Sequence, residues 1–178
     1  MRLIGLLVIA LLAGPVAADQ PTDAFSRTVA GLRNGSAAAT AHDRARLGAA
    51  VRLLEASGAH PMDGDDDLVK SWRARVGVAP APAYRDRALG PAYRHIVLAR
   101  AATMHFEQTF LAGQRARIAV VPIRRAAARL QVEDDDGHRV CAAAATGGCD
   151  WVPVWTTRFR VDVVNTGTRD AEYIVVIQ

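Results

Sequence analysis

Residues 158–163 read Arg-Phe-Arg-Val-Asp-Val, so charged and apolar side chains alternate at every position. Successive side chains of a β-strand point to opposite faces, and this alternation therefore predicts a strand with one buried and one hydrated face. The same period-two pattern recurs after residue 92, in short stretches separated by Gly, Pro, Asn or Asp. The predicted strands are 94–100, 103–110, 115–121, 128–133, 138–142, 158–163 and 173–177. This spacing is typical of an antiparallel β-sandwich.

Before residue 80 the apolar residues follow a helical period instead. Phe25, Val29 and Leu32 are spaced to share one helix face, and Thr22 precedes them as a candidate N-cap. The Asn-Gly-Ser stretch at 34–36 is expected to end this first helix.

Two further helices are predicted before the first strand. One is expected to start at Thr40, with Asp43 completing a capping box, and to end at Gly58. The other carries acidic residues in its first turn and basic residues in its last, an order that suits the helix dipole. The acidic residues are Asp65, Asp66 and Asp67, and the basic ones are Arg73 and Arg75. The apolar faces are expected to be Leu47, Val51 and Leu54, and then Leu68, Trp72 and Val76.

A proline-rich stretch at 80–92 separates the two patterns and is expected to be an extended connector. The predicted fold class is therefore α+β, with a short N-terminal helical segment at 19–79 and an antiparallel, jelly-roll-like β-sandwich at 93–178.

The first eighteen residues have the pattern of a signal peptide. Arg2 is followed by an uncharged apolar stretch and by the small residues of Val16-Ala17-Ala18, so cleavage is expected after Ala18. The apolar stretch is too short for a transmembrane helix, which needs about 20 residues. We therefore expect a periplasmic or extracellular protein; an uncleaved N-terminal anchor is the alternative.

The chain has two cysteines, Cys141 and Cys149. In an exported protein, two cysteines this close together predict a disulfide. The alternative is a redox or metal-binding pair, although a Cys-x-x-Cys spacing is absent.

Three stretches resemble the bacterial pre-peptidase C-terminal domain: residues 110–114, residues 130–137, and residues 159–165 followed by Tyr173. The resemblance covers the C-terminal half only. It implies a jelly-roll β-sandwich that serves as an accessory or binding module and carries no catalytic residues. The family's acidic pair before the central strand is replaced here by alanines at 126–128, which puts a calcium site of that kind in doubt.

Metal ligands are sparse in the sequence. The acidic run at 133–136 suggests calcium at Asp134 and Asp136, but an EF-hand register fails there, and a solvated hairpin is the alternative. A zinc site of His95, His105 and Glu107 would require strands 94–100 and 103–110 to form a hairpin in the right register. No cofactor is predicted apart from this possible calcium.

Trp151 and Trp155 are expected to face the same way, either as core residues beside the disulfide or as an aromatic ligand platform. Arg158 and Arg160 lie on the outer face of the predicted strand. They are expected either to pair with carboxylates of a neighbouring strand or to bind a ligand.

The functional prediction is a non-catalytic binding or accessory protein for a protein, peptide or cell-envelope polymer. The formal charge is +4 with interleaved signs, so no concentrated basic face favours nucleic acid. The alternative is a small exported hydrolase that uses carboxylates or a metal at the helix–sandwich junction. The sequence does not indicate the oligomeric state.

Overall fold

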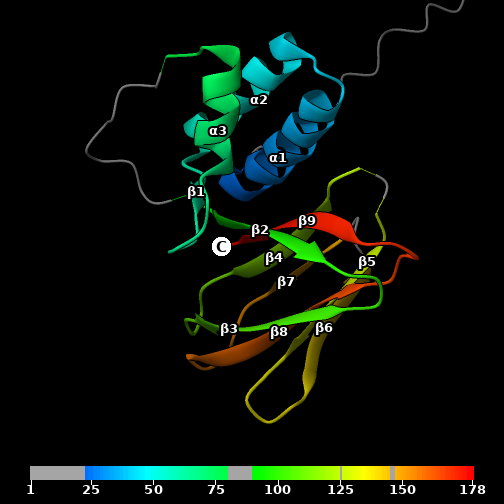
Figure 1. The fold of residues 1–178 in the computed structure, drawn as a ribbon. Coiled ribbons are helices and arrows are strands. Elements are labelled where there is room, and N and C mark those ends of the chain that lie inside the picture. Colours follow the sequence, from blue (N-terminus) through cyan, green and yellow to red (C-terminus); the bar gives the residue numbers. More distant parts are fainter. Residues whose placement is uncertain (1–22, 80–89, 125, 145–146) are drawn as a thin grey trace, which may run out of the picture.

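The computed structural model describes residues 23–79, 90–124, 126–144 and 147–178, and it has three layers (Figure 1). A layer of helices covers one face of a five-stranded sheet, and a four-stranded sheet covers the other face. The α+β prediction is confirmed. The predicted signal peptide and residues 80–89 of the predicted connector lie outside the described residues.

Helix α1 (Ala24–Thr40) is longer than predicted. Its N-cap is Asp23, whose carboxylate accepts a hydrogen bond from the Ser26 N–H, whereas the predicted cap Thr22 lies outside the described residues. The predicted break at 34–36 is wrong. A Cβ at Gly35 would lie 2.2 Å from a ring carbon of Trp72, so the glycine permits close helix packing instead of ending the helix.

Helix α2 (Arg44–Ser57) has Asp43 as its N-cap, so the predicted start at Thr40 is wrong; Thr40 is the last residue of α1. The helix ends at Gly58 as predicted, and this glycine adopts the left-handed conformation. Helix α3 (Leu68–Val76) is capped by Asp67. The predicted acidic first turn is therefore wrong, because Asp65 and Asp66 precede the helix. None of the helices among the described residues has the length and apolar character needed to cross a bilayer.

The strands form two sheets with the orders β1-β2-β9-β4-β7 and β3-β8-β5-β6. Their bounds are β1 His60–Pro61, β2 Ala92–Leu98, β3 Thr103–Phe110, β4 Ala116–Pro122, β5 Ala128–Glu133, β6 Arg139–Ala144, β7 Gly148–Trp151, β8 Thr157–Asn165 and β9 Ala171–Ile177. The sequence pattern missed the short strands β1 and β7. Strand β1 pairs parallel with β2 and so ties the helical layer to the sheet.

The expected hairpin of the first two long strands is wrong. Strand β2 pairs with β9 in one sheet, and β3 pairs with β8 in the other. His95 and His105 therefore lie on different sheets, and the zinc site that needed both of them on one face does not form.

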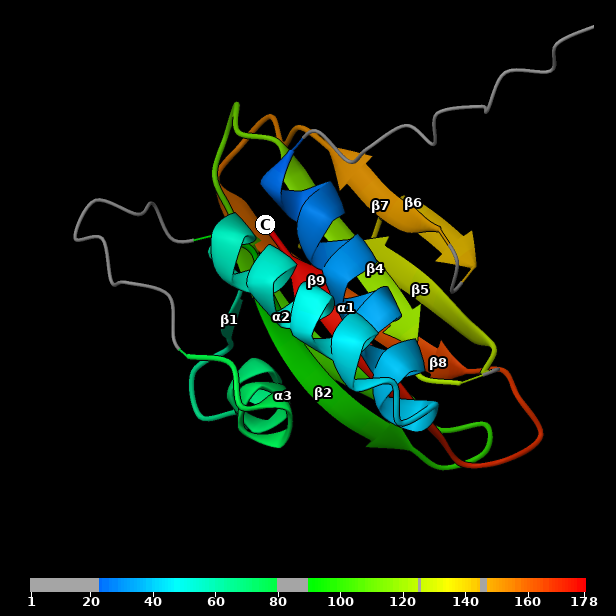
Figure 2. The same ribbon diagram turned by 90° about the horizontal axis from the view of Figure 1, so that it is seen from above.

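Two apolar cores share the five-stranded sheet. Tyr173, Val175 and Ile177 of β9 face the four-stranded sheet, in a core that also contains Leu130 and Val161. The intervening residues of β9 face α1, α2 and α3, which lie across the outer face of the sheet (Figure 2). These two are Ile174 and Val176, and both are fully buried. The central strand of the five-stranded sheet, β9, therefore has no hydrated face.

Asn165 holds together the end of the sandwich where β2, β4 and β8 terminate. Its buried side-chain amide donates hydrogen bonds to the carbonyls of Leu98, Ala99 and Arg169, at 3.1, 3.0 and 2.8 Å. Its Oδ1 accepts hydrogen bonds from the Gly167 N–H and the Tyr173 hydroxyl. One side chain thus satisfies polar groups of the β2–β3 connection, of the β8–β9 connection and of strand β9.

The Asn165→Ala substitution should lower the free energy of unfolding by about 2–4 kcal/mol, because buried carbonyls lose their donor. Urea unfolding measures this loss. The matched control Asn34→Ala, at an exposed position of α1, should change stability by less than about 0.5 kcal/mol. Equal effects of the two substitutions would contradict this role of Asn165.

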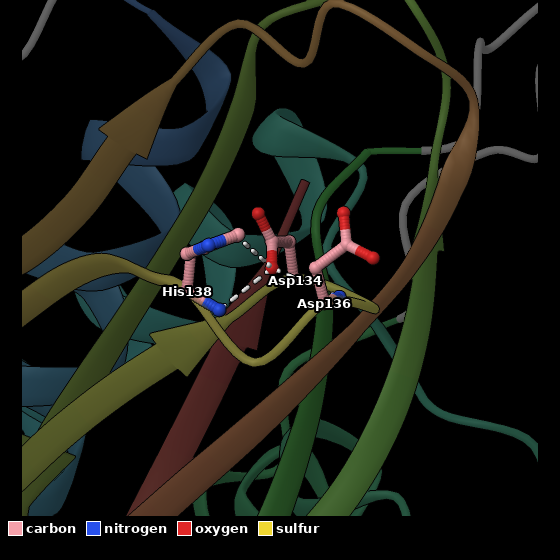
Figure 3. Close-up of side chains that lie close together, drawn as sticks. All are labelled: Asp134, Asp136 and His138. Atoms are coloured by element: carbon pink, nitrogen blue, oxygen red, sulfur yellow. Dashed lines mark hydrogen bonds and ion pairs between the residues drawn. The ribbon is translucent and has the colours of Figure 1, made fainter.

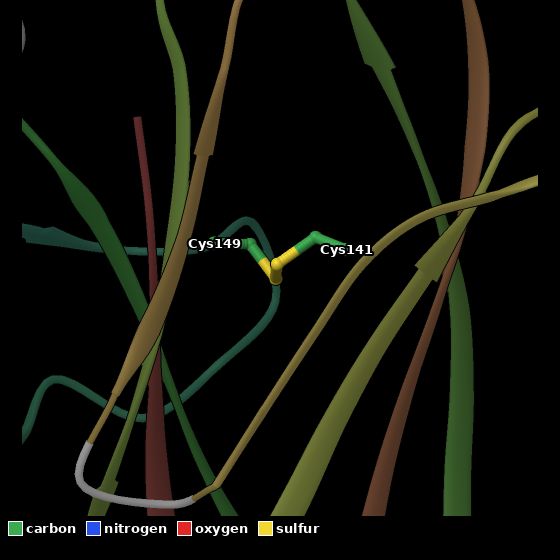
Figure 4. Close-up of a disulfide and its surroundings, with 2 residues drawn as sticks. All are labelled: Cys141 and Cys149. Atoms are coloured by element: carbon green, nitrogen blue, oxygen red, sulfur yellow. A yellow bond between two sulfur atoms is a disulfide. The ribbon is translucent and has the colours of Figure 1, made fainter.

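The predicted disulfide is confirmed. Cys141 lies on β6 and Cys149 on β7, with their Cα atoms 5.8 Å apart (Figure 4). These two strands are edges of different sheets, so the bond closes one side of the sandwich.

Replacing both cysteines with alanine should lower the free energy of unfolding by about 2–3 kcal/mol, since a short loop loses its covalent closure. Denaturant unfolding of the double variant, compared with wild-type protein with and without a reductant, measures the effect. Reduced wild-type protein should match the variant. Unchanged stability in both would show that the bond does not stabilise the fold.

Candidate interaction surface

Two neighbouring loops form the most apolar exposed part of the described surface. The β3–β4 loop and the β7–β8 loop are joined by hydrogen bonds from the Gly113 N–H to the Pro153 carbonyl, at 2.9 Å, and from the Ala112 N–H to Thr156 Oγ1, at 3.0 Å. Four large apolar side chains on these loops are exposed, and we call them the loop patch. Its members and their exposed fractions are Leu111 at 49%, Val152 at 57%, Val154 at 76% and Trp155 at 77%.

The two tryptophans predicted to share a face do not share one. Strand β7 ends at Trp151, and the chain then turns through the buried Pro153, so the strand alternation stops before Trp155. The Trp151 ring packs in the sandwich core, with its centroid 5.0 Å from that of Phe110 and 5.4 Å from that of Phe159. Trp151 therefore supports the base of the loop, and Trp155 alone projects into solvent.

Arg158 and Arg160 lie on the outer face of β8, as expected. Arg158 pairs with a carboxylate of the neighbouring strand β3, whereas Arg160 pairs with Asp162 of its own strand, so the expected cross-strand pairing is wrong for Arg160. Arg158 Nη1 lies 3.0 Å from Glu107 Oε2, and Arg160 Nε lies 3.2 Å from Asp162 Oδ1. The same Asp162 oxygen lies 2.6 Å from His105 Nδ1. The arginines are thus part of a group of ion pairs on the sheet face beside the loop patch. Their role in ligand binding stays a prediction.

The acidic hairpin between β5 and β6 lies at the same end of the sandwich, next to the start of β8. Figure 3 shows its side chains Asp134, Asp136 and His138. Asp134 Oδ1 accepts hydrogen bonds from the backbone N–H groups of Asp136, at 3.1 Å, and of His138, at 2.8 Å, so this carboxylate organises the turn. The hydroxyl of Thr157 donates a hydrogen bond to Asp135, which ties the hairpin to the start of β8. The hairpin is therefore held against the strand that follows the loop patch.

The residues predicted to bind calcium lie close together in this hairpin. Asp134, Asp136 and His138 offer two carboxylate oxygens and one ring nitrogen that all lie within 4.8 Å of one another. Calcium binds six to eight oxygens, and the Asp134 oxygen already serves the turn. These residues alone do not complete a calcium site.

An ionic cluster connects the start of α1 to strand β4 and to the edge strand β7, beside the loop patch. Arg117 of β4 lies 2.7 Å from Asp23 Oδ1, and its guanidinium stacks over the Phe25 ring at 4.2 Å from the centroid. Arg115 makes two hydrogen bonds to Asp150, at 2.8 and 2.6 Å. These hydrogen bonds lower the pKa of the Asp150 carboxyl.

The pKa of Asp23 is also affected by its contacts. Burial raises this pKa, but hydrogen bonds from Ser26 and Arg117 outweigh the effect of burial and leave the pKa well below its usual range.

Asp65 and Asp67 at the helix–sandwich junction are held by structural partners. Asp65 lies 2.7 Å from Arg94 Nε. Asp67 caps α3 and accepts a hydrogen bond of 2.8 Å from the Tyr93 hydroxyl. Burial raises the pKa of Tyr93 well above its ordinary value, so the phenol stays protonated as the donor. These contacts fix the helical layer on the sheet rather than presenting an acid–base pair to solvent.

The lowered pKa of Asp23 gives a testable pH dependence. A depressed folded-state pKa stabilises the protein above the unfolded-state pKa of about 3.8, and this stabilisation is lost as the pH falls through the folded-state value. Asp23→Asn, which retains a capping side chain, should therefore cost at most about 1 kcal/mol at pH 7, because the pair is solvent-screened. Thermal unfolding should show the gap to wild type shrinking progressively below about pH 4. A gap that is independent of pH would rule out the ion pair as its cause.

No known protein family and no curated protein sequence matches this chain. Solved structures do match about half of it. A periplasmic inhibitor of g-type lysozyme from Aeromonas hydrophila, PliG, aligns at 14% identity and a TM-score of 0.41, over 49% of this chain and 86% of the inhibitor. Its counterpart from Salmonella Typhimurium aligns at 13% identity and a TM-score of 0.38, over 49% and 89% of the two chains. The pre-peptidase C-terminal domain of a Bacillus anthracis collagenase aligns at 10% identity and a TM-score of 0.40, over 47% and 87%. The family that the sequence resembles is thus represented among these matches.

Proposed function

We propose that this protein is an exported, non-catalytic binding protein that holds a protein or peptide partner at the loop patch. The observation that carries the proposal is the exposure of Trp155, at 77%, beside three other exposed apolar side chains. A contiguous apolar surface on a folded domain is a typical mark of an interaction site. Tryptophan is also among the residues that contribute most to protein interfaces.

The loop patch is rigidly supported. The two loops are hydrogen-bonded to each other, Pro153 is buried between exposed residues, and Trp151 anchors the start of the second loop in the core. A surface that is ordered before binding loses less conformational entropy when the partner docks. This support favours a role for Trp155 in binding over the alternative that its exposure has no function.

The charge next to the loop patch indicates the kind of partner. The hairpin places three consecutive carboxylates, Asp134 to Asp136, beside the start of β8. Asp136 makes no ion pair among the described residues. A partner surface with an apolar centre and basic side chains at its rim would complement this arrangement.

The composition of the loop patch favours protein over the cell-envelope polymer that the sequence left open. Sugar rings stack on aromatic faces, and only one indole is available here because Trp151 packs in the core. The remaining members, Leu111, Val152 and Val154, are aliphatic side chains that suit an apolar protein surface.

Export is supported by the pattern of residues 1–18 and by the disulfide. A bond between Cys141 and Cys149 persists in an oxidising compartment and is rare in the reducing cytosol.

The test uses peptides selected from a random display library on the folded protein, titrated against wild type and variants. Trp155→Ala should weaken binding at least about 30-fold, the equivalent of losing about 2 kcal/mol at a hot spot. Its thermal stability should stay unchanged because the side chain is exposed. The selected peptides should be rich in basic and apolar residues.

The matched control is Val97→Ala, which removes another exposed apolar side chain, 66% exposed, from strand β2. This variant should bind the selected peptides as wild type does. Peptides that bind Trp155→Ala with full affinity would overturn the proposal, and so would saturable binding of soluble envelope polysaccharide in place of peptide.

A further inference from the structure

A hollow of about 330 Å³ lies at the opposite end of the sandwich from the loop patch. It opens between α1, α3 and the five-stranded sheet, where β4 ends and β9 begins. A volume of this size is within the range of small-molecule sites. The residues that line this hollow include Leu68, Trp72, Arg75, His95, Arg124 and Glu172.

Two arginines at this hollow come from separate parts of the chain. Arg75 lies in the last turn of α3, and Arg124 lies in the β4–β5 turn. Neither guanidinium group makes a hydrogen bond or an ion pair within the described part of the chain. The acidic residue in the lining, Glu172, lies 3.3 Å from His95 Nε2 and so already has a partner. The hollow is therefore lined by two guanidinium groups that have no carboxylate partner of their own.

The backbone at Arg124 adds an independent observation. Its φ is +62°, in the left-handed region that glycine adopts freely and other residues adopt at a cost. The neighbouring backbone is fixed by a hydrogen bond from the Ile123 N–H to the Glu172 carbonyl, at 2.9 Å. A long cationic side chain thus occupies a position where glycine would relieve strain, and such an outlier points to a function for the side chain.

The remaining walls are partly apolar, and they contain one polar group without a hydrogen-bond partner. Leu68, Trp72 and Ile123 supply apolar surface. The hydroxyl of Ser36 is buried and has no hydrogen-bond partner in the described residues. An orphaned buried hydroxyl in a native fold indicates a missing partner, such as a bound water or ligand group.

We propose that this hollow binds a small anionic ligand, with its carboxylate or phosphate group held between Arg75 and Arg124. Guanidinium groups bind both of these anions through paired, charge-assisted hydrogen bonds. The apolar part of the ligand lies against Leu68 and Ile123. The site is separate from the loop patch and does not depend on the function proposed for that surface.

The experiment is calorimetric titration of the full mature protein with hexanoate and with inorganic phosphate, at constant ionic strength. Wild type binds at least one of the two anions at a single site. Hexanoate binding identifies a carboxylate ligand, and phosphate binding identifies a phosphate ligand. Hexanol, the neutral analogue of hexanoate, binds at least about tenfold more weakly than the anion does.

Two variants and a matched control locate the site. Arg124→Gly weakens anion binding about tenfold or more and melts at the same or a higher temperature, because the strain at φ +62° is relieved. Arg75→Ala weakens binding similarly. Arg52→Ala, at an exposed position of α2, leaves binding unchanged. The proposal is overturned if neither anion gives saturable binding at millimolar concentration, if hexanol binds as well as hexanoate, or if both arginine variants bind like wild type.

Discussion

Burial of the central strands on both faces is the constraint on which the rest of this structure depends. In β9, Val175 faces the four-stranded sheet, while Ile174 and Val176 face the helices, and all three are fully buried. Each buried aliphatic side chain contributes about 1.5–3 kcal/mol relative to exposure. Loss of the helical layer would therefore hydrate an entire face of the sheet. The helices and the sandwich are one structural unit, which the parallel pairing of β1 with β2 reinforces.

Because the centre is filled on both sides, the exposed features concentrate at edges and ends. The disulfide joins the edge strands β6 and β7, and Asn165 fixes the connections at one end of the sandwich. The loops at the other end are free of such a central polar network, yet they are held by hydrogen bonds to each other. A rigid scaffold with loops at its ends is an arrangement that proteins use widely for recognition.

The two ends differ in chemistry. One presents Trp155 among aliphatic side chains, with carboxylates next to it, and suits a protein surface with basic groups. The other presents Arg75 and Arg124 over an apolar wall and suits a small anion. The paired charges on the outer face of β8 lie along the sheet and present no excess of one sign.

Local patterns in the sequence were sufficient for several features. Alternation at 158–163 predicted a strand with Phe159, Val161 and Val163 inside, and the structure buries all three, because side-chain direction in a strand is a local property. The disulfide followed from having only two cysteines, and the end of α2 followed from Gly58, which adopts the left-handed conformation readily.

Features that depend on residues far apart in the chain could not be predicted from local sequence patterns. The run of buried residues at 173–177 was interpreted by period two, although a continuous apolar run is the signal of a strand covered on both faces. Likewise, residues 34–36 looked like a helix break, because nothing local reveals that Trp72 packs on Gly35.

The sequence by itself thus determined the element types, the inward residues of most strands and the covalent bond, since these depend on neighbours along the chain. Only the tertiary structure decided that β2 and β3 belong to different sheets. It also decided that the loop of Leu111 is hydrogen-bonded to the loop of Trp155 and that Arg75 and Arg124 line the same hollow. These juxtapositions arise from packing between residues far apart in the chain, and no local period encodes them.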